Sequence, residues 1–545
     1  MPDQPPGSNL HYFQPDWIEP SSETIETDIC VYGGTSGGIA AAVTATARGL
    51  RVVILQPGKH LGGMTSGGLG WTDFGRKYVI GGLSRTFYAE VGKHYGLDEE
   101  WQFEPRVAEA VYERWVKTHG VDVRFCQYLD TVQIDGRRIT SISCLGGLRV
   151  TARIFMDCSY EGDLMGATGV SYHVGRESNA VYGETLNGIQ VQDKHQFGLA
   201  VDPYLIEGDP ASGLLPQIED IDLTQMQGEG DHRVQAYCFR MCMTDDPALK
   251  IDWQKPATFD PARYVLATRW FNTVGDEDTG NHSAFPKEHV RENGVPGKFD
   301  ILPNRTPGGY CKTDTNNHGA FSSDYIGRSW AWPAASYAHR ETLFQEHVEY
   351  QRGLYWHVAN EPAIPSRFRD AYNRWGLSSD EFTDTEHWPH QLYIRECRRM
   401  IGDYVITEHD CNEVSVAEDA IGMGSYTMDS HNCTRFVTTE NGQARVLNDG
   451  DVQIPPTDPY PVSYRCIVPK KGQASNLFVP TCFSASHISY GSARMEPVFM
   501  VLGESAGIAA ALCLDAGCDV QDLPYGDLRP ELEAADQILT RPATT

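Results

Sequence analysis

The stretch TDICVYGGTSGG, residues 27–38, constrains the fold more than any other part of the chain. Residues 27–32 form a short apolar run that is typical of a strand, and a glycine-rich turn follows at residues 33–38. A helix of small residues, IAAAVTATARG, then ends at Gly49, and a second apolar run at residues 51–55 ends at Gln56. This order predicts a βαβ unit with a nucleotide-binding turn, and therefore an α/β fold of Rossmann type.

The turn departs from the usual dinucleotide pattern at two positions. Glycines let the backbone approach a pyrophosphate, and the following helix N-terminus offers free N–H groups to the phosphate charge. In the pattern G-x-G-x-x-G, Gly33 and Gly38 match, but Thr35 replaces the second glycine. Gln56 stands where an Asp or Glu usually binds the ribose, and an amide holds a hydroxyl less strongly than a carboxylate. The alternative is a tight turn in an α/β protein of another kind.

A second glycine-rich stretch, PGKHLGGMTSGGLGWTD, follows directly at residues 57–73. So many glycines after the second strand do not suit a plain NAD fold. They favour a loop whose backbone lies against a large, flat ligand. The alternative is a flexible glycine loop with no ligand.

These and later stretches resemble a known family. VYGGTSGGIAAA, PGKHLGGMTSGGLGWTD, DCSYEGDLMGATGVSYHVGRE, LYIRECRRMIGDYVITEHD and VPTCFSASHISYGSARMEPVFMVLGESAGIAAAL are similar to the FAD-dependent oxidoreductases whose bacterial members are often labelled "xanthan lyase-related". The resemblance covers residues 27–515. It implies FAD as the cofactor and a glutathione-reductase-like FAD-binding domain, with an inserted α+β substrate domain.

The glycine turns and the resemblance together give a set of expected cofactor contacts. The stretch from Asp157 to Asp163, in FMDCSYEGDL, resembles the return strand of the FAD-binding domain and is expected to end near the ribose and phosphates. The expected contacts are Gly33, Gly34, Thr35, Ser36, Gly37, Gly38, Gln56, Pro57, Gly62, Gly63, Met64, Gly67, Gly68, Asp157, Glu161, Gly503, Ser505, Ala506 and Gly507. Covalent attachment of the flavin at His60 is a further, weaker hypothesis.

The same evidence divides the chain into segments. We expect a polar N-terminal tail at 1–26, the first part of the FAD-binding domain at 27–180 and the inserted substrate domain at 181–385. The second part of the FAD-binding domain, with a flavin-closing helix, follows at 386–530, and a C-terminal tail at 531–545. No second glycine-rich turn follows a strand, so a dedicated NAD(P)H domain is not expected.

Residues 503–507, GESAG, match the nucleophile elbow G-x-S-x-G of serine hydrolases. A hydrolase of that fold needs a histidine after the serine, but the last histidine of the chain is His487, before Ser505. In proteins of the resembled family, a C-terminal helix points its N-terminus at the flavin. We therefore expect the small residues at 503–507 to allow close approach there, with Ser505 in packing or capping.

The segment SASHISYGSARMEP supplies the candidate catalytic groups. Hydride transfer from an alcohol or amine needs a base for the leaving proton, and His487 suits neutral pH. Arg494 is expected either to pair with Glu496 or to anchor a substrate carboxylate. Arg395 is a further pocket candidate, as are His390 and Tyr393. For each of these residues a purely structural role is the alternative.

Composition limits the partners. The formal net charge of −28 argues against nucleic acid. The 14 cysteines include no C-x-x-C pair, so we expect reduced thiols, no metal site and a cytoplasmic protein. No run of about 18 apolar residues is present, so no membrane partner is expected. The oligomeric state is left open by the sequence.

The sequence therefore predicts an FAD-dependent oxidoreductase that oxidises a small oxygenated or amine-bearing molecule, such as a sugar, polyol or secondary metabolite, by hydride transfer to flavin N5. Oxygen or an external acceptor would reoxidise the flavin. The alternatives are a reductase or monooxygenase fed by NAD(P)H, a non-catalytic FAD-binding protein, and a serine hydrolase that uses Ser505.

Overall fold

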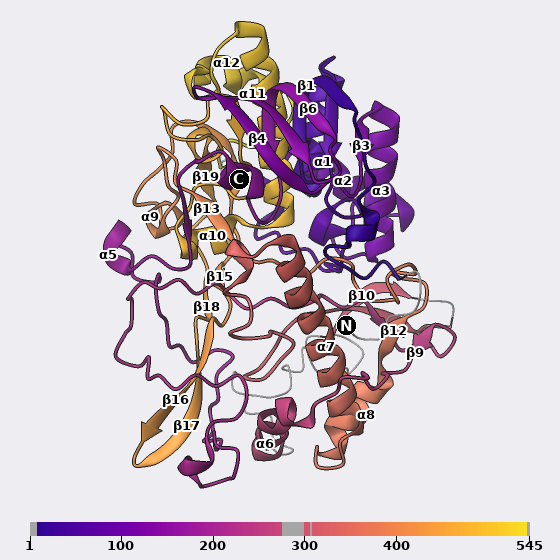
Figure 1. Cartoon of the computed structure of the whole chain (residues 1–545), viewed down its shortest axis with the longest axis vertical. Coiled ribbons are helices and arrows are strands. Elements are labelled where there is room, and N and C mark those ends of the chain that lie inside the picture. Colours follow the sequence, from indigo (N-terminus) through magenta and orange to yellow (C-terminus); the bar gives the residue numbers. More distant parts are fainter. Residues whose placement is uncertain (1–7, 275–298, 306–307, 542–545) are drawn as a thin grey trace.

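The computed structural model describes residues 8–274, 299–305 and 308–541. In this part of the chain, seven strands form one sheet in the upper half of Figure 1. Its parallel strands, in spatial order, are β3 (Asp122–Arg124), β2 (Val52–Leu55), β1 (Thr24–Tyr32), β6 (Arg149–Asp157) and β20 (Leu477–Phe478). Strands β5 (Arg138–Cys144) and β4 (Leu129–Asp135) extend β6 in antiparallel fashion. The predicted Rossmann-type α/β core is confirmed.

Two helices pack directly on each other beside this sheet. They are α1 (Ser36–Ala47), which follows β1, and α11 (Glu496–Ala516). Glycines allow this close approach. A Cβ on Gly37 would lie only 2.8 Å from the Phe499 carbonyl oxygen, and a Cβ on Gly507 would lie only 2.7 Å from the Ala41 carbonyl oxygen. The same domain carries α2 (Gly82–His94), α3 (Pro105–His119), α4 (Asp163–Ala167), α10 (His487–Ala493) and α12 (Tyr525–Ala534).

By length and composition, α11 is the one helix in the described residues that could cross a membrane. However, 94% of its apolar window is buried inside the protein, and the core helix of a globular protein passes the same test. The packing of α11 on α1 and the sheet explains why this long helix is composed mostly of apolar residues.

A second unit lies in the lower half of Figure 1. Its sheet has the order β10 (Phe299–Arg305), β11 (Cys311–Thr315), β8 (Met243–Thr244), β12 (Gly376–Ser378) and β9 (Lys250–Ile251). The helices of this unit are α6 (Val265–Val274), α7 (Tyr337–Asn360) and α8 (Ser366–Arg374). They bury an apolar core of their own that includes Trp270, Tyr350 and Phe368.

The second unit also takes in residues beyond position 385, where the sequence placed its end. The hairpin of β16 (Thr434–Glu440) and β17 (Gln443–Asp449) projects down beside it, and Val446 joins its core. Smaller antiparallel pairs and short helices complete the described chain: β13 (Arg398–Met400) with β7 (Tyr172–Val174), β14 (Ala420–Gly424) with β19 (Tyr460–Ser463), β15 (Met428–Ser430) with β18 (Val452–Ile454), α5 (Asn179–Tyr182) and α9 (Glu408–Cys411).

The predicted N-terminal tail is packed against the protein rather than free. Residues 1–7 lie outside the described part, but residues 8–17 form a segment that we call the N-terminal strap. Leu10 in the strap is 1% exposed, and the Tyr12 hydroxyl donates to Glu161 of the FAD-binding domain at 2.8 Å. The Tyr12 and Phe13 amides donate to Glu341 on α7, at 2.8 and 2.9 Å. The strap therefore ties the two units together.

The predicted C-terminal tail is likewise partly packed. Helix α12 extends through Ala534, and both Gln537 and Leu539 are buried. Residues 542–545 lie outside the described part. The tail prediction is thus wrong for residues 531–539, because these residues cover α11 and the start of α2.

Candidate functional site

The glycine turn between β1 and α1 has the geometry that the sequence predicted. Gly33 has φ +102°, and a Cβ there would lie 2.7 Å from the Ser159 amide nitrogen. The Thr35 hydroxyl donates to the Cys158 carbonyl at 2.8 Å and accepts from the Gly38 amide at 3.2 Å. Thr35 therefore caps α1 and fixes the turn to β6, which explains why it can replace the usual glycine.

Gln56 at the end of β2 turns back toward this loop. Its side-chain oxygen accepts from the Gly34 amide at 2.7 Å, so that oxygen is already engaged. Gln56 still lines the cleft that opens at the turn. The expected ribose contact can therefore come from its amide nitrogen.

A cleft of about 760 Å³ opens from the glycine turn. Its lining combines the turn, the loop after β2, the end of β6 and the strap. The lining residues are Asn9, His11, Tyr12, Trp17, Gly33, Gly34, Thr35, Gln56, Pro57, Gly58, Lys59, His60, Gly63, Ser159, Tyr160, Glu161, Phe344, His390, Gln391 and Leu392. The cleft reaches the N-cap of α1 at Thr35, and helix N-termini of this kind bind anions such as a pyrophosphate.

One side chain in this cleft also indicates a ligand. Both ring nitrogens of His390 are buried and have no hydrogen-bond partner among the described residues. A buried polar atom without a partner costs free energy, so a polar group is expected to satisfy it. The residues of the cleft thus fit a large, phosphorylated cofactor such as FAD.

Other predicted contacts lie around the cleft rather than on it. Gly62 packs on the Tyr112 ring, and Gly67 and Gly68 let Gln391 and Arg240 approach closely. Glu161, by contrast, lines the cleft itself and accepts the Tyr12 hydrogen bond.

Asp157, at the end of β6, supports the cleft from behind. Its carboxylate accepts from the Ser159 hydroxyl at 2.6 Å and the Met165 amide at 2.7 Å. Burial raises the pKa of Asp157 to about 6, although these hydrogen bonds act in the opposite direction. Asp157 therefore holds the turn after β6 instead of contacting a ligand.

A smaller chamber of about 350 Å³ adjoins the cleft, because Tyr160 lines both. The chamber is lined by Met64, Leu69, Asp73, Tyr160, Tyr393, Ile394, Arg395, Tyr490, Arg494, Met495, Glu496 and Phe499. It lies at the N-terminus of α11, which begins at Glu496.

Glu496 is buried where the N-termini of α1 and α11 meet. Its carboxylate accepts from the hydroxyls of Ser36 at 2.5 Å, Tyr160 at 2.7 Å and Thr65 at 2.8 Å. Burial raises the pKa of Glu496, although the three hydroxyl donors oppose that rise. The predicted pairing of Glu496 with Arg494 is wrong, because Arg494 faces Asp429 instead.

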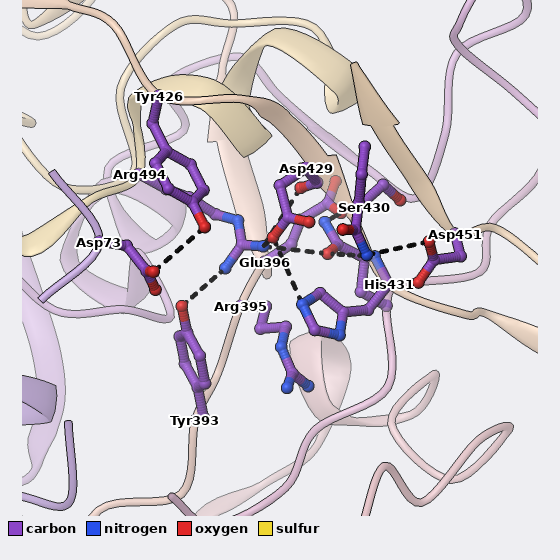
Figure 2. A network of polar contacts seen from close by, with 12 residues as sticks. Asp73, Tyr393, Arg395, Glu396, Tyr426, Asp429, Ser430, His431, Asp451 and Arg494 are labelled. Atoms are coloured by element: carbon purple, nitrogen blue, oxygen red, sulfur yellow. Dashed lines mark hydrogen bonds and ion pairs between the residues drawn. The ribbon is translucent and has the colours of Figure 1, made fainter. Parts of the chain in front are cut away.

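The polar wall of the chamber is drawn in Figure 2. Arg494 donates to the Tyr393 hydroxyl at 3.2 Å, and the Tyr426 hydroxyl donates to Asp73 at 3.1 Å. Arg395 pairs with Asp324 at 2.8 Å and stacks on Tyr393. Arg395 and Arg494, both predicted from the sequence, do come together here.

An open groove of about 820 Å³ lies outside the chamber, and Asp73 lines both. The lining of the groove is mixed, and its aromatic and proline residues are Trp71, Phe74, Tyr426, Pro455, Pro456 and Pro459. Asp73 therefore stands between the chamber and solvent. The sequence analysis missed this role, since one aspartate after a glycine loop carries no pattern of its own.

His487 does not lie in the chamber or the cleft, so its predicted role as a base is wrong. It begins α10 and is 2% exposed. Its Nδ1 lies 2.8 Å from Glu396 and its Nε2 lies 3.0 Å from Ser430, so both ring nitrogens are engaged. Burial, followed by the positive charges of Arg399 and Arg176, lowers the pKa of His487 to about 3.

The GESAG segment lies in the middle of α11, not at its N-terminus. A Cβ on Gly503 would fall far inside the contact distance of the Gly37 carbonyl on α1. The Ser505 hydroxyl is buried and donates to the Ile421 carbonyl at 2.8 Å. Gly503, Ser505, Ala506 and Gly507 therefore pack α11 against α1 and β14, and contact neither the cleft nor the chamber.

Among the described residues, no group of three or more His, Cys, Asp or Glu side chains is placed to hold a metal ion. None of the 14 cysteines, which all lie in the described part of the chain, forms a disulfide bond, and most of them are buried.

Several solved flavoproteins match part of the chain at low similarity. A flavin-containing monooxygenase from Stenotrophomonas maltophilia has 16% identity and a TM-score of 0.19, over 28% of this chain and 43% of its own. An anhydrotetracycline hydroxylase, OxyS, from Streptomyces rimosus has 13% identity and a TM-score of 0.21, over 28% and 36%. An L-proline dehydrogenase from P. horikoshii has 12% identity and a TM-score of 0.24, over 29% and 59%.

This chain therefore covers less than two thirds of each of those three structures. TM-scores this low support no inference about the reaction of this chain. A search of curated proteins returned no significant match. The family comparison is much more extensive, since the model described as "FAD dependent oxidoreductase" matches residues 28–532. With a glycine turn, a cleft suited to FAD and a family match over nearly its whole length, this chain belongs to the FAD-dependent oxidoreductases.

Proposed function

We propose that this enzyme oxidises a small polar molecule bearing an alcohol or an amine, and that the reaction takes place in the chamber. The observation that carries the proposal is that the two cavities lie side by side and share Tyr160 in their walls. The cleft fits the nucleotide part of FAD, and the adjoining chamber brings Asp73, Tyr393 and Arg494 together. Bound FAD supplies a two-electron acceptor for a hydride.

The chain must supply a group for the proton that leaves the substrate. When an alcohol is oxidised, its carbon loses a hydride, its oxygen loses a proton, and a C=O bond forms. We assign the proton to Asp73, because this carboxylate lines the chamber and also the open groove. It can accept a proton on one side and release it to solvent on the other.

Tyr393 and Arg494 orient the substrate in this proposal. Burial raises the pKa of Tyr393, although the charge of Arg494 opposes that rise, so the phenol keeps its proton and can donate it in a hydrogen bond. Arg494 is held from behind by Gln235, whose amide donates to Glu396 at 2.8 Å. Glu396 in turn lies beside His487, so His487 is a positioning residue three contacts behind Arg494.

The test is anaerobic reduction of the purified, FAD-loaded enzyme, followed by the loss of flavin absorbance in a stopped-flow instrument. A screen of small polyols, hydroxy acids and amines should find compounds that bleach the flavin, whereas NADPH should not. Rapid bleaching by NADPH would instead favour the monooxygenase or reductase reaction. Mixing the reduced enzyme with oxygen or a dye then identifies the acceptor.

The role of Asp73 has a matched control. Asp73→Asn should slow flavin reduction by about 100-fold, in the range typical of losing a general base, while leaving the bound-flavin spectrum unchanged. Asp98→Asn, at an exposed position outside both cavities, should reduce at the wild-type rate. Equal rates for Asp73→Asn and wild type would remove Asp73 from the mechanism.

A further inference from the structure

Arg494 is a buried guanidinium that is weakly satisfied. Its side chain is 1% exposed, yet its contacts are long: 3.2 Å to the Tyr393 hydroxyl, 3.2 Å to the Asp429 carbonyl, and 3.4 Å to both the Asp429 carboxylate and Gln235. Its Nε–H is buried and has no hydrogen-bond partner in the described chain. Arg494 therefore has five N–H donors but makes only four hydrogen bonds among the described residues, and all four are long.

Two other buried arginines in the same region make shorter contacts, although Arg395 in the chamber wall also has a buried Nε without a hydrogen-bond partner among the described residues. Arg399 donates to Glu177 at 2.7 Å, to the Gly175 carbonyl at 2.8 Å and to the Ala485 carbonyl at 3.1 Å. Arg240 holds Asp314 through two nitrogens. Because a buried donor without a good partner costs free energy, the uniformly long contacts of Arg494 indicate a partner still to come.

The carboxylate nearest to Arg494 is also shared with another residue. Asp429 lies 3.4 Å from His431 Nε2 as well as 3.4 Å from Arg494, and His431 Nδ1 lies 3.0 Å from Asp324. Figure 2 shows Arg494 reaching from this network toward Tyr393, on the side of the wall that also carries Asp73. The positive charge at the chamber wall is therefore only partly compensated.

We propose that the chamber binds the carboxylate of its substrate through Arg494, and that the substrate is a small hydroxy or amino acid. This inference rests on the proposed function, because it places the oxidised carbon in the same chamber. A planar carboxylate matches the edge of a guanidinium and can accept two N–H bonds from it. The Tyr393 hydroxyl, which accepts from Arg494, has its own hydrogen free to donate to the same carboxylate.

The position of Asp73 restricts the substrate further. A molecule anchored at Arg494 presents its neighbouring carbon to the rest of the chamber, where Asp73 is the carboxylate that opens to solvent. The anchored carboxylate would then face the positive charge of Arg494, and the proton-bearing group would face the carboxylate of Asp73. The chamber is narrow and largely enclosed by side chains, so it suits a molecule of a few carbon atoms better than a sugar polymer.

The test measures binding to the oxidised, FAD-loaded enzyme with acetate as the probe and acetamide as its neutral counterpart. Perturbation of the flavin spectrum and the shift in melting temperature report binding without turnover. Acetate should bind at least about tenfold more tightly than acetamide. Arg494→Gln should weaken acetate binding at least about 30-fold, and Arg494→Lys should lose less, because it keeps the charge but not the planar fork.

Two further variants keep the test decisive. Tyr393→Phe should weaken acetate binding several-fold, and it serves if Arg494→Gln fails to fold. Arg114→Gln removes an exposed guanidinium on α3 and should bind acetate like the wild type.

The inference is overturned if acetate binds no better than acetamide, or if Arg494→Gln binds acetate as the wild type does. A lower flavin midpoint potential in Arg494→Gln, with acetate affinity unchanged, would mean that the guanidinium serves the flavin instead, and would also overturn it. Failure of the proposed function has a different signature: no compound of any class bleaches the flavin anaerobically, whatever the outcome with acetate.

Discussion

His60 and His390 stack in the cleft with their ring centroids 3.9 Å apart and an angle of 8° between the rings. Their pKa values move in opposite directions. Burial alone would lower the pKa of His60, but hydrogen bonds to Asp384 and Glu109 raise it to about 9. Burial and the charge of His60 lower the pKa of His390 well below its usual value. The stack is therefore a cationic ring on a neutral one at neutral pH.

This relationship predicts a fall in stability in mild alkali. Folded His60 keeps its proton up to about pH 9, whereas the unfolded side chain loses it near pH 6.5. Its contribution is fully present below about pH 6.5 and is lost as the pH rises through 9. Urea unfolding should show a loss on the order of 2 kcal/mol over that range, after allowance for the exposure of Asp384.

Two variants assign this effect to His60. His60→Gln should flatten the dependence on pH between 6.5 and 9. His390→Gln should keep it, because the carboxylates of Glu109 and Asp384 remain on His60. A wild-type protein that is equally stable at both pH values would contradict the argument.

The N-terminal strap predicts slow release of FAD. Asn9, His11, Tyr12 and Trp17 line the cleft, and Lys59 both donates to Asn9 at 2.7 Å and lies over the Trp17 ring. Deletion of residues 2–17 should speed FAD dissociation by at least about tenfold, measured as the recovery of free FAD fluorescence after dilution.

A point variant separates the cleft contact from general loss of packing. Tyr12→Phe removes the hydrogen bond to Glu161 and should speed dissociation about fivefold, as expected for about 1 kcal/mol. Tyr78→Phe, at a tyrosine that is 52% exposed, should leave the rate unchanged. Unchanged release from the deletion would show that the strap is not part of the FAD site.

The first βαβ unit could be predicted because its signals are local. A turn of glycines, a helix of alanines and two apolar runs suffice to place β1, α1 and β2 within about three residues. The strap could not be found this way, since Tyr12 and Glu161 are 149 residues apart and nothing in a polar N-terminus indicates such a contact.

Two other features had signals that were overlooked. Asn441-Gly442, both with positive φ, marks the turn of the β16–β17 hairpin. Pro497 in the first turn of α11 marks the start of that helix, eight residues before Ser505. In the chamber, Arg494 and Arg395 were found from their neighbours in the sequence. Asp73 was not, because its importance comes from lining two cavities at once.

Ser505→Ala should have no effect on chemistry. The hydroxyl is buried and donates to the Ile421 carbonyl, so its loss should cost about 1 kcal/mol in the free energy of unfolding. Hydrolysis of an activated ester such as p-nitrophenyl acetate should be the same with and without the serine. Ester hydrolysis that disappears in the variant would restore the hydrolase hypothesis.

The packing of α11 on α1 predicts a sharp difference between two glycine variants. A Cβ on Gly503 would collide with the Gly37 carbonyl, and the two helices cannot separate without disturbing the glycine turn at the start of α1. Gly503→Ala should therefore lower the free energy of unfolding by about 3 kcal/mol or more and weaken FAD binding.

Gly526→Ala is the control, because Gly526 is in α12 and a Cβ there would meet no described atom within 4 Å. That variant should be neutral or more stable by up to about 1 kcal/mol, since alanine favours a helix. Chemical unfolding and FAD titration measure both effects, and equal stability of the two variants would mean that the helices are not in the close contact described.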